Sequence, residues 1–263
     1  MREKLTANCR NRTIFQVDRK LICRNWQETK YLLLLSSIEF SVLSKYRIYG
    51  DSFVMADVQQ KTKNAVTLRG SAQIIREYLQ FAVNSIIFQR GIYPPETFKA
   101  EHQYGIPLWI SEDPGIKSFI NSLLSQSEEW IVSRKVKKIS LIILNVQTKE
   151  VLECWDFNLE CEEGDAALTA ENKAVTGSKE LKKIQQEIRD VMLQISATVS
   201  YLPLLDCRCS FDILTHVADD CELPEKWSEA QPVHITNSQN VRLKSFSTSV
   251  HKMETVVNFK MTD

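Results

Sequence analysis

The chain has 263 residues and a mass of 30.3 kDa, enough for one large domain or two small ones with a substantial buried core. Hydrophobic residues make up 43% and charged residues 25%, which excludes a wholly disordered chain. Basic and acidic residues both number 33, so the formal net charge is zero and does not attract nucleic acid or an anionic membrane. With neither a signal peptide nor a membrane-spanning run, we expect no nucleic-acid and no membrane partner.

The first 54 residues differ from the rest in charge and in pattern. They contain ten basic and five acidic residues and show no clear helical or strand period. Met55 then opens a polar stretch through Asn64, like a second beginning. We interpret residues 1–54 as an N-terminal extension that is disordered or is not part of the natural chain, which would start at Met55, and residues 55–65 as a flexible tail.

Three helices are predicted from apolar side chains that recur at helical spacing. They cover residues 67–91, 113–130 and 178–201. The first is apolar on nearly all sides, so we expect it to lie centrally, with Gly91 as its stop. The second begins at Asp113-Pro114, and the third has Ser178 as its N-cap.

Strands are predicted from short apolar or alternating runs, at residues 106–110, 139–144, 155–161, 211–217, 241–250 and 255–261. The run at 139–144 is apolar on both faces, which is typical of an interior strand. Residues 147–150 join it to the next strand at hairpin length. Residues 162–179 are polar and lack an apolar period, so we predict an exposed loop there.

Motifs that carry chemistry are absent from the sequence, which has no phosphate-binding loop, dinucleotide-binding glycine motif, zinc-protease motif or hydrolase elbow. The four histidines have no evident ligand partner beside them in the sequence. Among seven cysteines, Cys207 and Cys209 form one compact pair, but two ligands are not a zinc site. We interpret both as inert reduced thiols, with metal or redox use as the alternative.

The C-terminal part, from Ala218 to the end, is polar, is twice interrupted by proline and carries Trp227 before two final strands. A terminal hairpin is the easiest element of a sheet to detach. An exposed sheet edge can then bind a partner strand through backbone hydrogen bonds. This part of the chain therefore predicts a partner rather than a reaction.

Long ordered motifs resemble the HORMA-domain proteins of the spindle assembly checkpoint, over residues 66–260. The motifs are TLRGSA at 67–72, NSIIFQRGIYP at 84–94, VLE at 151–153 with WDFNLEC at 155–161, ATV at 197–199 with LPLL at 202–205, LPEKW at 223–227, and ITNS at 235–238 with VRL at 241–243. The resemblance implies an α+β HORMA domain at residues 66–263. Its three main helices pack on a mostly antiparallel sheet, and a mobile C-terminal hairpin, the safety belt, spans about 218–263.

In that family the protein converts between open and closed conformers, traps partner peptides under the belt and inhibits the activator of the anaphase-promoting complex. It delays anaphase without enzymatic activity and without a cofactor. The belt leaves one side of the sheet, pairs anew on the other and displaces an N-terminal segment that maps around residues 66–68. We place the receiving edge at residues 211–217, flanked by the third helix.

The resemblance also implies partners and places. The partners are mitotic arrest deficient one, the activator subunit of the anaphase-promoting complex, the kinase-like scaffold of the mitotic checkpoint complex, and a closed-form-binding adaptor with its AAA-type remodelling ATPase. An open copy also pairs with a closed copy. The expected locations are the nucleus and cytoplasm, and in mitosis the kinetochore and spindle pole.

Carried over residue by residue, the resemblance assigns three groups of site residues. For partner-peptide binding they are Phe211, Leu214, Val217, Trp227, Val250 and His251. For self-association they are Arg90, Glu153, Leu193, Gln194 and Lys244. For the conformational switch they are Leu68, Trp155 and Tyr201. Leu193 and Lys244 both replace an arginine of the family, and Lys244 keeps the charge but loses the planar fork.

Three alternatives remain open at the level of the sequence. A HORMA adaptor of another pathway, translesion DNA synthesis or the meiotic axis, would use the same belt on different peptides. An enzyme built on Cys207 and Cys209 would lose activity on Cys→Ser substitution. A single-state structural protein would show one conformer and no exchange of the belt.

Overall fold

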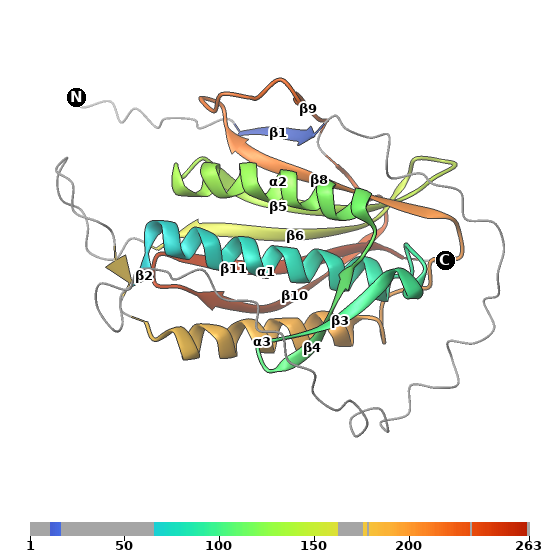
Figure 1. Ribbon diagram of the computed structural model, residues 1–263. Helices are drawn as coiled ribbons and strands as arrows, with labels where there is room; N and C mark the ends of the chain where they lie inside the picture. The colour runs from blue at the N-terminus through green and yellow to red at the C-terminus, as the bar shows by residue number, and fades with distance from the viewer. Residues whose placement is uncertain (1–10, 17–65, 163–175, 178, 232, 262–263) are drawn as a thin grey trace, which may run out of the picture. The chain divides into compact units, whose positions relative to one another are not determined.

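The computed structural model describes residues 11–16, 66–162, 176–177, 179–231 and 233–261. Their main feature is an antiparallel sheet of seven strands in the order β10-β11-β6-β5-β8-β1-β9 (Figure 1). The strands are β1 (Asn11–Gln16), β5 (Val136–Asn145), β6 (Val151–Cys161), β8 (Cys209–Ala218), β9 (Trp227–Glu229), β10 (Ser238–Ser247) and β11 (His251–Lys260). The two strands latest in the chain lie at one end of this order, and the earliest strand lies near the other.

Three helices cover one face of the sheet, α1 (Leu68–Gln89), α2 (Pro114–Val132) and α3 (Leu181–Thr198). The first two begin with side-chain caps, and α2 begins at the predicted Asp113-Pro114. The Thr67 hydroxyl accepts from the Gly70 N–H at 3.0 Å, and the Asp113 carboxylate accepts from the Gly115 and Ile116 N–H groups. Proline at the first position of α2 costs no hydrogen bond, because that N–H has no partner inside a helix.

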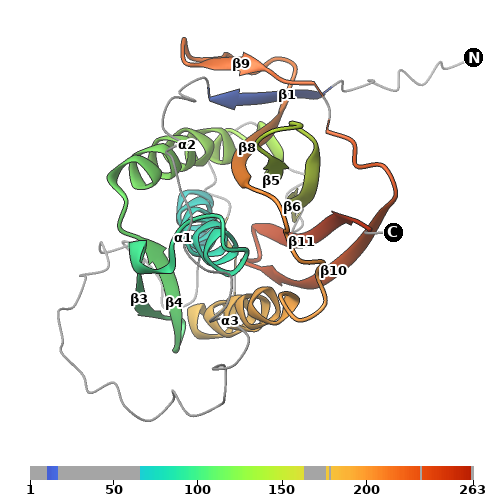
Figure 2. The same cartoon turned by 90° about the vertical axis from the view of Figure 1, so that its right-hand side faces the viewer.

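The helix α1 lies between α2 and α3 and against the sheet (Figure 2). This position explains its all-round apolar sequence, because side chains on several faces, among them Ile75, Phe81 and Ile87, are buried. The core is continuous from these residues to the inner faces of β5, β6, β8 and β11. The prediction of an α+β fold with three helices on a mostly antiparallel sheet is confirmed.

Two small sheets complete the described part of the chain. One pairs β3 (Phe98–Gln103) with β4 (Ile106–Ser111) after a short 3-10 turn, η3 (Pro95–Thr97). The other pairs β2 (Val66–Thr67) with β7 (Thr176–Gly177). The sequence predicts β4 but not β3, whose lysine, glutamate and histidine side chains give it a mostly exposed, polar face.

Three predictions need correction. Residues 176–177 form a strand inside the predicted loop at 162–179, and residues 163–175 lie outside the described part. The N-cap position of α3 is Glu180, which makes no side-chain capping bond, and Ser178 is not described. Residues 1–54 are not unstructured throughout, since Asn11–Gln16 form β1. The other residues of that segment, and residues 55–65, lie outside the described residues.

Candidate functional site

The strand β1 lies in a slot between β8 and β9. Along β8 its register partners run from Asn11 opposite Ala218 to Phe15 opposite Leu214, five pairs in all. On its other side three residues pair with β9. A strand from near the start of the chain is therefore held by backbone pairing on both edges.

Side chains of β1 alternate between the two faces of the sheet, as a strand requires. Ile14 is fully buried in the core on the helix side, where the Gln16 amide also donates to the Ser122 hydroxyl of α2 at 2.9 Å. On the opposite face Phe15 packs against a second cluster that includes Leu214. The slot therefore recognises side chains as well as backbone.

One basic residue anchors the N-terminal end of β1. The Arg12 guanidinium donates to the Cys221 carbonyl oxygen at 2.5 Å and pairs with the Glu229 carboxylate at 3.3 Å. Next to it, the Thr13 hydroxyl and the His216 Nδ1 are 3.0 Å apart. Charged and polar groups at this end set the direction and register of the strand.

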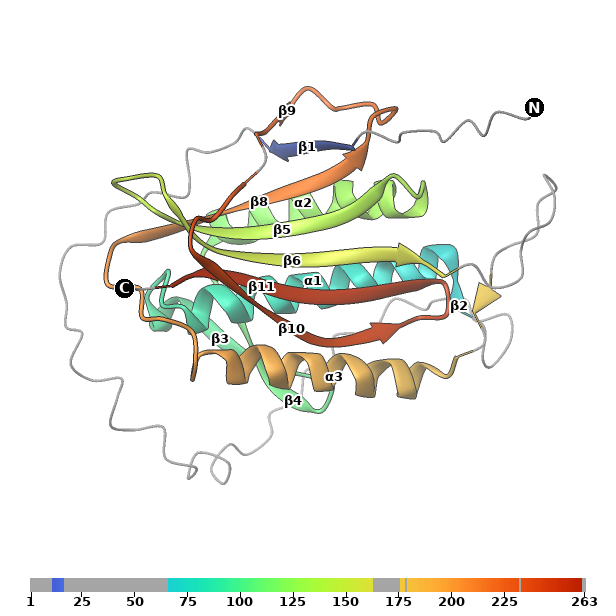
Figure 3. The same cartoon turned by 180° about the vertical axis from the view of Figure 1, so that it is seen from behind.

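Residues 230, 231 and 233–237, called here the crossing segment, lie between β9 at one edge of the sheet and β10 at the opposite edge. They cross the face that the helices leave uncovered (Figure 3). The Ala230 N–H donates to the Thr13 carbonyl at 2.7 Å, and Val233 and Ile235 join the second cluster with Phe15. The chain therefore first pairs with the edge of β1 through β9, and the crossing segment then packs on the same side of the sheet as Phe15 of β1.

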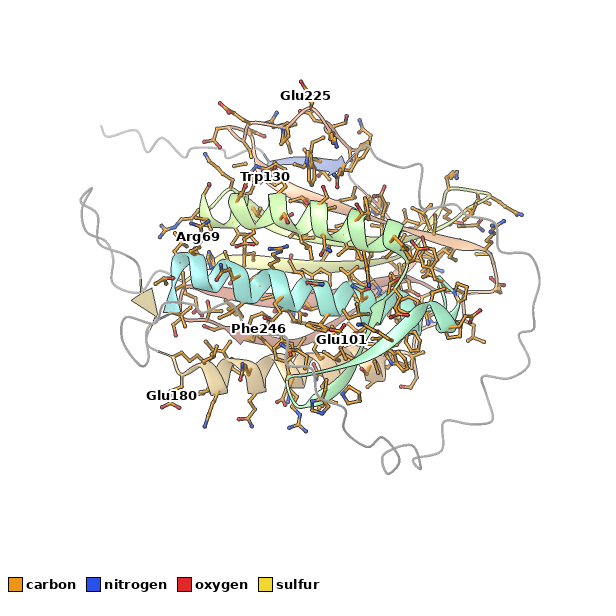
Figure 4. All side chains as sticks on the ribbon, viewed as in Figure 1. Arg69, Glu101, Trp130, Glu180, Glu225 and Phe246 are labelled. Atoms are coloured by element: carbon orange, nitrogen blue, oxygen red, sulfur yellow. The ribbon has the colours of Figure 1, made fainter. Side chains whose placement is uncertain are left out.

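A pair of tryptophans closes the slot on the helix side. Trp130 lies on the side of α2 nearest β1 and β9 (Figure 4), and its ring meets Trp227 of β9 edge to face at 4.8 Å. Trp227 is buried although β9 has only three residues. Burial of this large ring fixes β9 in place.

The hairpin of β10 and β11 is fixed at the other end of the sheet. Nine residues of β11 are in register with β6. The Tyr78 hydroxyl of α1 lies 2.7 Å from the Thr255 hydroxyl, and the Tyr78 ring contacts Phe246 edge to face at 4.9 Å. Burial raises the pKa of Tyr78, so this hydroxyl stays neutral.

The turn of the hairpin is held by a buried polar network. His251 Nδ1 lies 2.7 Å from the Ser71 hydroxyl, which in turn lies 2.7 Å from the Thr248 hydroxyl. The Thr248 hydroxyl also accepts from the His251 N–H at 2.9 Å. Burial, with a smaller effect of Arg134, lowers the pKa of His251 to about 4, so the network contains a neutral imidazole at physiological pH.

The structure brings together only part of the predicted peptide-binding group. Leu214, Val217 and Trp227 surround β1. Phe211 lies on β8 but is buried between the rings of Tyr93 and Phe119.

Val250 and His251, the other two members of that group, lie at the turn of the hairpin. His251 stands in register with Cys161, and the Val250 carbonyl accepts from the Glu162 N–H. They are therefore near the end of β6 and not at the slot. The predicted neighbour of the receiving edge also needs correction, because α2 lies beside this end of the sheet while α3 packs on β10.

The five residues predicted for self-association fall into two sets. Arg90 and Glu153 form a buried ion pair, with Nε to Oε1 at 2.7 Å, and Arg90 also donates to the Pro203 carbonyl. Leu193, Gln194 and Lys244 lie together on α3 and β10, where Leu193 is 45% exposed. The Gln194 amide oxygen accepts from the Lys244 N–H at 2.6 Å. Only the second set presents a surface to another molecule.

The three predicted switch residues are not in one place. Leu68 opens α1, Tyr201 is exposed beyond α3, and Trp155 is buried on β6 opposite Val257 of the hairpin. The Trp155 N–H donates to the Glu153 carboxylate at 3.1 Å. Trp155 is therefore the member of this group that the hairpin covers.

Of the predicted thiol pair, Cys209 is held in its protonated, unreactive form. Burial raises the pKa of Cys209 to about 12, with further effects of Cys207 beside it, so Cys209 stays protonated. Within the described residues no group of three or more His, Cys, Asp or Glu side chains could hold a metal ion. No helix among them is long and apolar enough to cross a membrane.

Sequence reasoning missed the residues that fill the slot. These are Arg12, Thr13, Ile14, Phe15 and Gln16, with Ser122, Cys221 and Glu229 as their partners. Residues 12–16 do not alternate between polar and apolar side chains, and one short run of Thr13, Ile14 and Phe15 is a weak strand signal in a segment of mixed charge. The distance of about 200 residues to β8 leaves no local sign of the pairing.

Comparison with known proteins identifies the family to which this fold belongs. The HORMA domain profile matches residues 71–251. The mouse and human proteins "Mitotic spindle assembly checkpoint protein MAD2A" are 44% and 42% identical over 202 and 204 residues, covering 77% and 78% of this chain and 96% and 97% of those proteins. One chain of the crystal structure of the mitotic checkpoint complex matches with a TM-score of 0.65 at 35% identity, over 73% of this chain and 99% of that chain.

The chain belongs to the HORMA domain family and, within it, to the MAD2 spindle checkpoint proteins.

Proposed function

We propose that the protein is a spindle assembly checkpoint protein that holds a peptide segment of its partners as an added strand in the slot between β8 and β9. The observation that carries this proposal is the six-residue strand β1, which is paired on both edges and lies beneath the crossing segment. Backbone pairing supplies sequence-independent affinity, and the side chains on alternate faces supply selectivity. The 42–44% identity to checkpoint proteins supports this role over another HORMA pathway.

The partners proposed for this slot are mitotic arrest deficient one and the activator subunit of the anaphase-promoting complex, whose inhibition delays anaphase. The kinase-like scaffold joins them in the mitotic checkpoint complex, and a closed-form-binding adaptor with its AAA-type ATPase reopens the protein. These partners place it in the nucleus and cytoplasm, and at kinetochores and spindle poles in mitosis. The protein acts by binding and catalyses no reaction.

The proposal includes two conformers. In the described arrangement the hairpin is on β6 and the edge of β8 pairs with β1, and we take this arrangement as the proposed closed form. In the open form the hairpin pairs on the other side of the sheet and occupies that edge. Conversion has to break the nine β6–β11 register pairs before new ones form, so we expect it to be slow compared with simple docking.

Titration with a labelled peptide from mitotic arrest deficient one tests the function. The full chain should bind it slowly and saturably, and ion exchange should separate two interconverting species. Val233→Asp puts a charge into the second cluster and should raise the dissociation rate by about tenfold or more, since each 1.4 kcal/mol is tenfold. Gln231→Asp adds the same charge at an exposed position of the same segment and should not. A folded chain that ignores this peptide would contradict the checkpoint assignment.

A further inference from the structure

The occupant of the slot is part of the chain itself. The HORMA match begins at residue 71, whereas β1 ends at Gln16. The slot walls, β8 and β9, belong to the matched region. The strand in the slot therefore comes from outside the matched domain. It occupies the position that we propose for a partner peptide.

We propose that residues 11–16 are a built-in ligand of this slot, which closes the belt in cis and which a partner peptide has to displace. This proposal rests on the proposed function, because it assumes that partners use the same slot. It also defines the chemistry of the peptides that fit. They carry a basic side chain where Arg12 stands, a β-branched or other apolar one at Ile14 and a second apolar one at Phe15.

The strand β1 makes the kind of contacts that a bound peptide makes, with side chains that fix it on both faces of the sheet. Arg12 supplies a charge-assisted pair with Glu229, and Ile14 is completely buried in the main core. Phe15 lies under the crossing segment with Ile235. An anchor on each face and a charge at one end fix one register.

The fit is incomplete, which makes the segment exchangeable. Within the described residues, the buried Gln16 side-chain oxygen and the buried Arg12 Nε have no hydrogen-bond partner. A buried polar atom without a partner weakens the state that buries it. A partner peptide without these two defects would bind the slot more tightly than β1 does.

Tethering compensates for the imperfect fit. A ligand carried on the same chain competes at an effective concentration that reaches on the order of millimolar for short flexible linkers and falls as the linker lengthens. Residues 17–65 separate β1 from β2 in the sequence. A partner peptide must therefore exceed β1 in intrinsic affinity before it can occupy the slot at micromolar concentration.

The test compares three full-length proteins, the unchanged chain, Ile14→Asp and Gln239→Asp. The first substitution puts a charge into the core position of β1, and the second adds the same charge at an exposed site on β10. Two labelled probes are used, a peptide of residues 10–18 of this chain and a peptide from mitotic arrest deficient one. Ile14→Asp should bind both at least tenfold more tightly than the unchanged chain, and Gln239→Asp should not.

The outcomes separate the two proposals. Equal affinity of the unchanged chain and Ile14→Asp for the checkpoint peptide overturns the built-in ligand but leaves the proposed function. Tighter binding of the 10–18 peptide alone supports the built-in ligand and contradicts the proposed partner. Loss of folding in Ile14→Asp is circumvented by Arg12→Ala, which removes the anchoring pair without burying a charge and should act in the same direction with a smaller effect.

Hydrogen exchange of the unchanged chain provides an independent reading. The amides of residues 12–16 should be protected in the monomer and should lose protection when the checkpoint peptide is added. Unprotected amides there overturn the proposal. Protection that appears only in a dimer in sedimentation also overturns it, because β1 would then fill the slot of another copy rather than its own.

Discussion

The two ends of the main sheet are both closed by segments from a chain terminus, yet they are held in different ways. At one end β11 has nine register pairs with β6, an apolar face in the core and two buried hydroxyl networks that tie the hairpin to α1. At the other end β1 has five pairs with β8 and three with β9, and within the described residues two of its buried atoms have no partner, against one, His251 Nε2, at the hairpin turn. We call the β10–β11 hairpin the latch, and under our proposal the β1 end is a site whose occupant can change.

The largest expected effect comes from fixing the latch covalently. Glu160 and Lys252 face each other across β6 and β11, and both side chains are exposed. Directly opposed residues of antiparallel strands are close enough for a disulfide. With Glu160→Cys and Lys252→Cys together, oxidation should abolish uptake of a labelled checkpoint peptide, and reduction should restore it.

Each single cysteine variant is the control for the oxidant, because it cannot form the disulfide and should take up the peptide equally before and after oxidation. Unchanged uptake by the oxidised double variant would mean that a peptide enters the slot without detachment of the hairpin. The conformer exchange in the proposed function would then be unnecessary for binding.

A buried charge pair lies beside the latch, because Glu153 of β6 is in register with Phe259 of β11, and its loss should be the largest effect on stability. Arg90→Ala leaves the Glu153 carboxylate buried without its guanidinium, which should lower the free energy of unfolding by about 3–5 kcal/mol. The measurement is urea denaturation followed by circular dichroism. Arg90→Met combined with Glu153→Leu removes both charges and should cost less than the single change. Wild-type stability with weakened pairing of copies would instead return Arg90 to the surface role that the resemblance assigned to it.

The spacing of apolar residues predicted most of the fold, because each helix and each core strand shows its hydrophobic period within one continuous segment. The all-round apolar residues of α1 and the doubly apolar run of β5 are examples. The arrangement of the site could be predicted from the sequence only in part. Arg90 and Glu153 are buried because they pair with each other, although charged residues usually lie on the surface. The placement of α2 beside β8 depends on packing between segments far apart in sequence, such as the contact of Phe119 with Phe211.

Acid should loosen both ends of the sheet, but through different histidines. Burial lowers the pKa of His251, at the latch, to about 4, and burial together with Lys138 does the same for His216, beside Thr13, against an opposing effect of Asp156. Both imidazoles are neutral in the fold and have an ordinary pKa of 6.5 when unfolded. Their contribution is complete above pH 6.5 and is lost as the pH falls toward 4.

Hydrogen exchange at pH 7.5 and pH 5.5 separates the two contributions. His216→Gln should remove the acid sensitivity of the β1 amides and leave that of the hairpin turn. Equal acid sensitivity of β1 in this variant and in the unchanged chain would show that the proton acts elsewhere.

The smallest expected effect lies on the outer side of the latch, where α3 meets β10. Leu193 is 45% exposed, and close by Lys244 makes a 3.0 Å ion pair with Asp190. Leu193→Arg restores the family's arginine and should strengthen pairing of two copies by a few-fold in sedimentation, without a change in peptide uptake at the slot. Lys182→Arg, on the same helix, is the matched control because it adds a guanidinium at another exposed position. Equal dimer affinities for Leu193→Arg and the unchanged chain would mean that the side chain at position 193 does not control the pairing of two copies, although it is exposed.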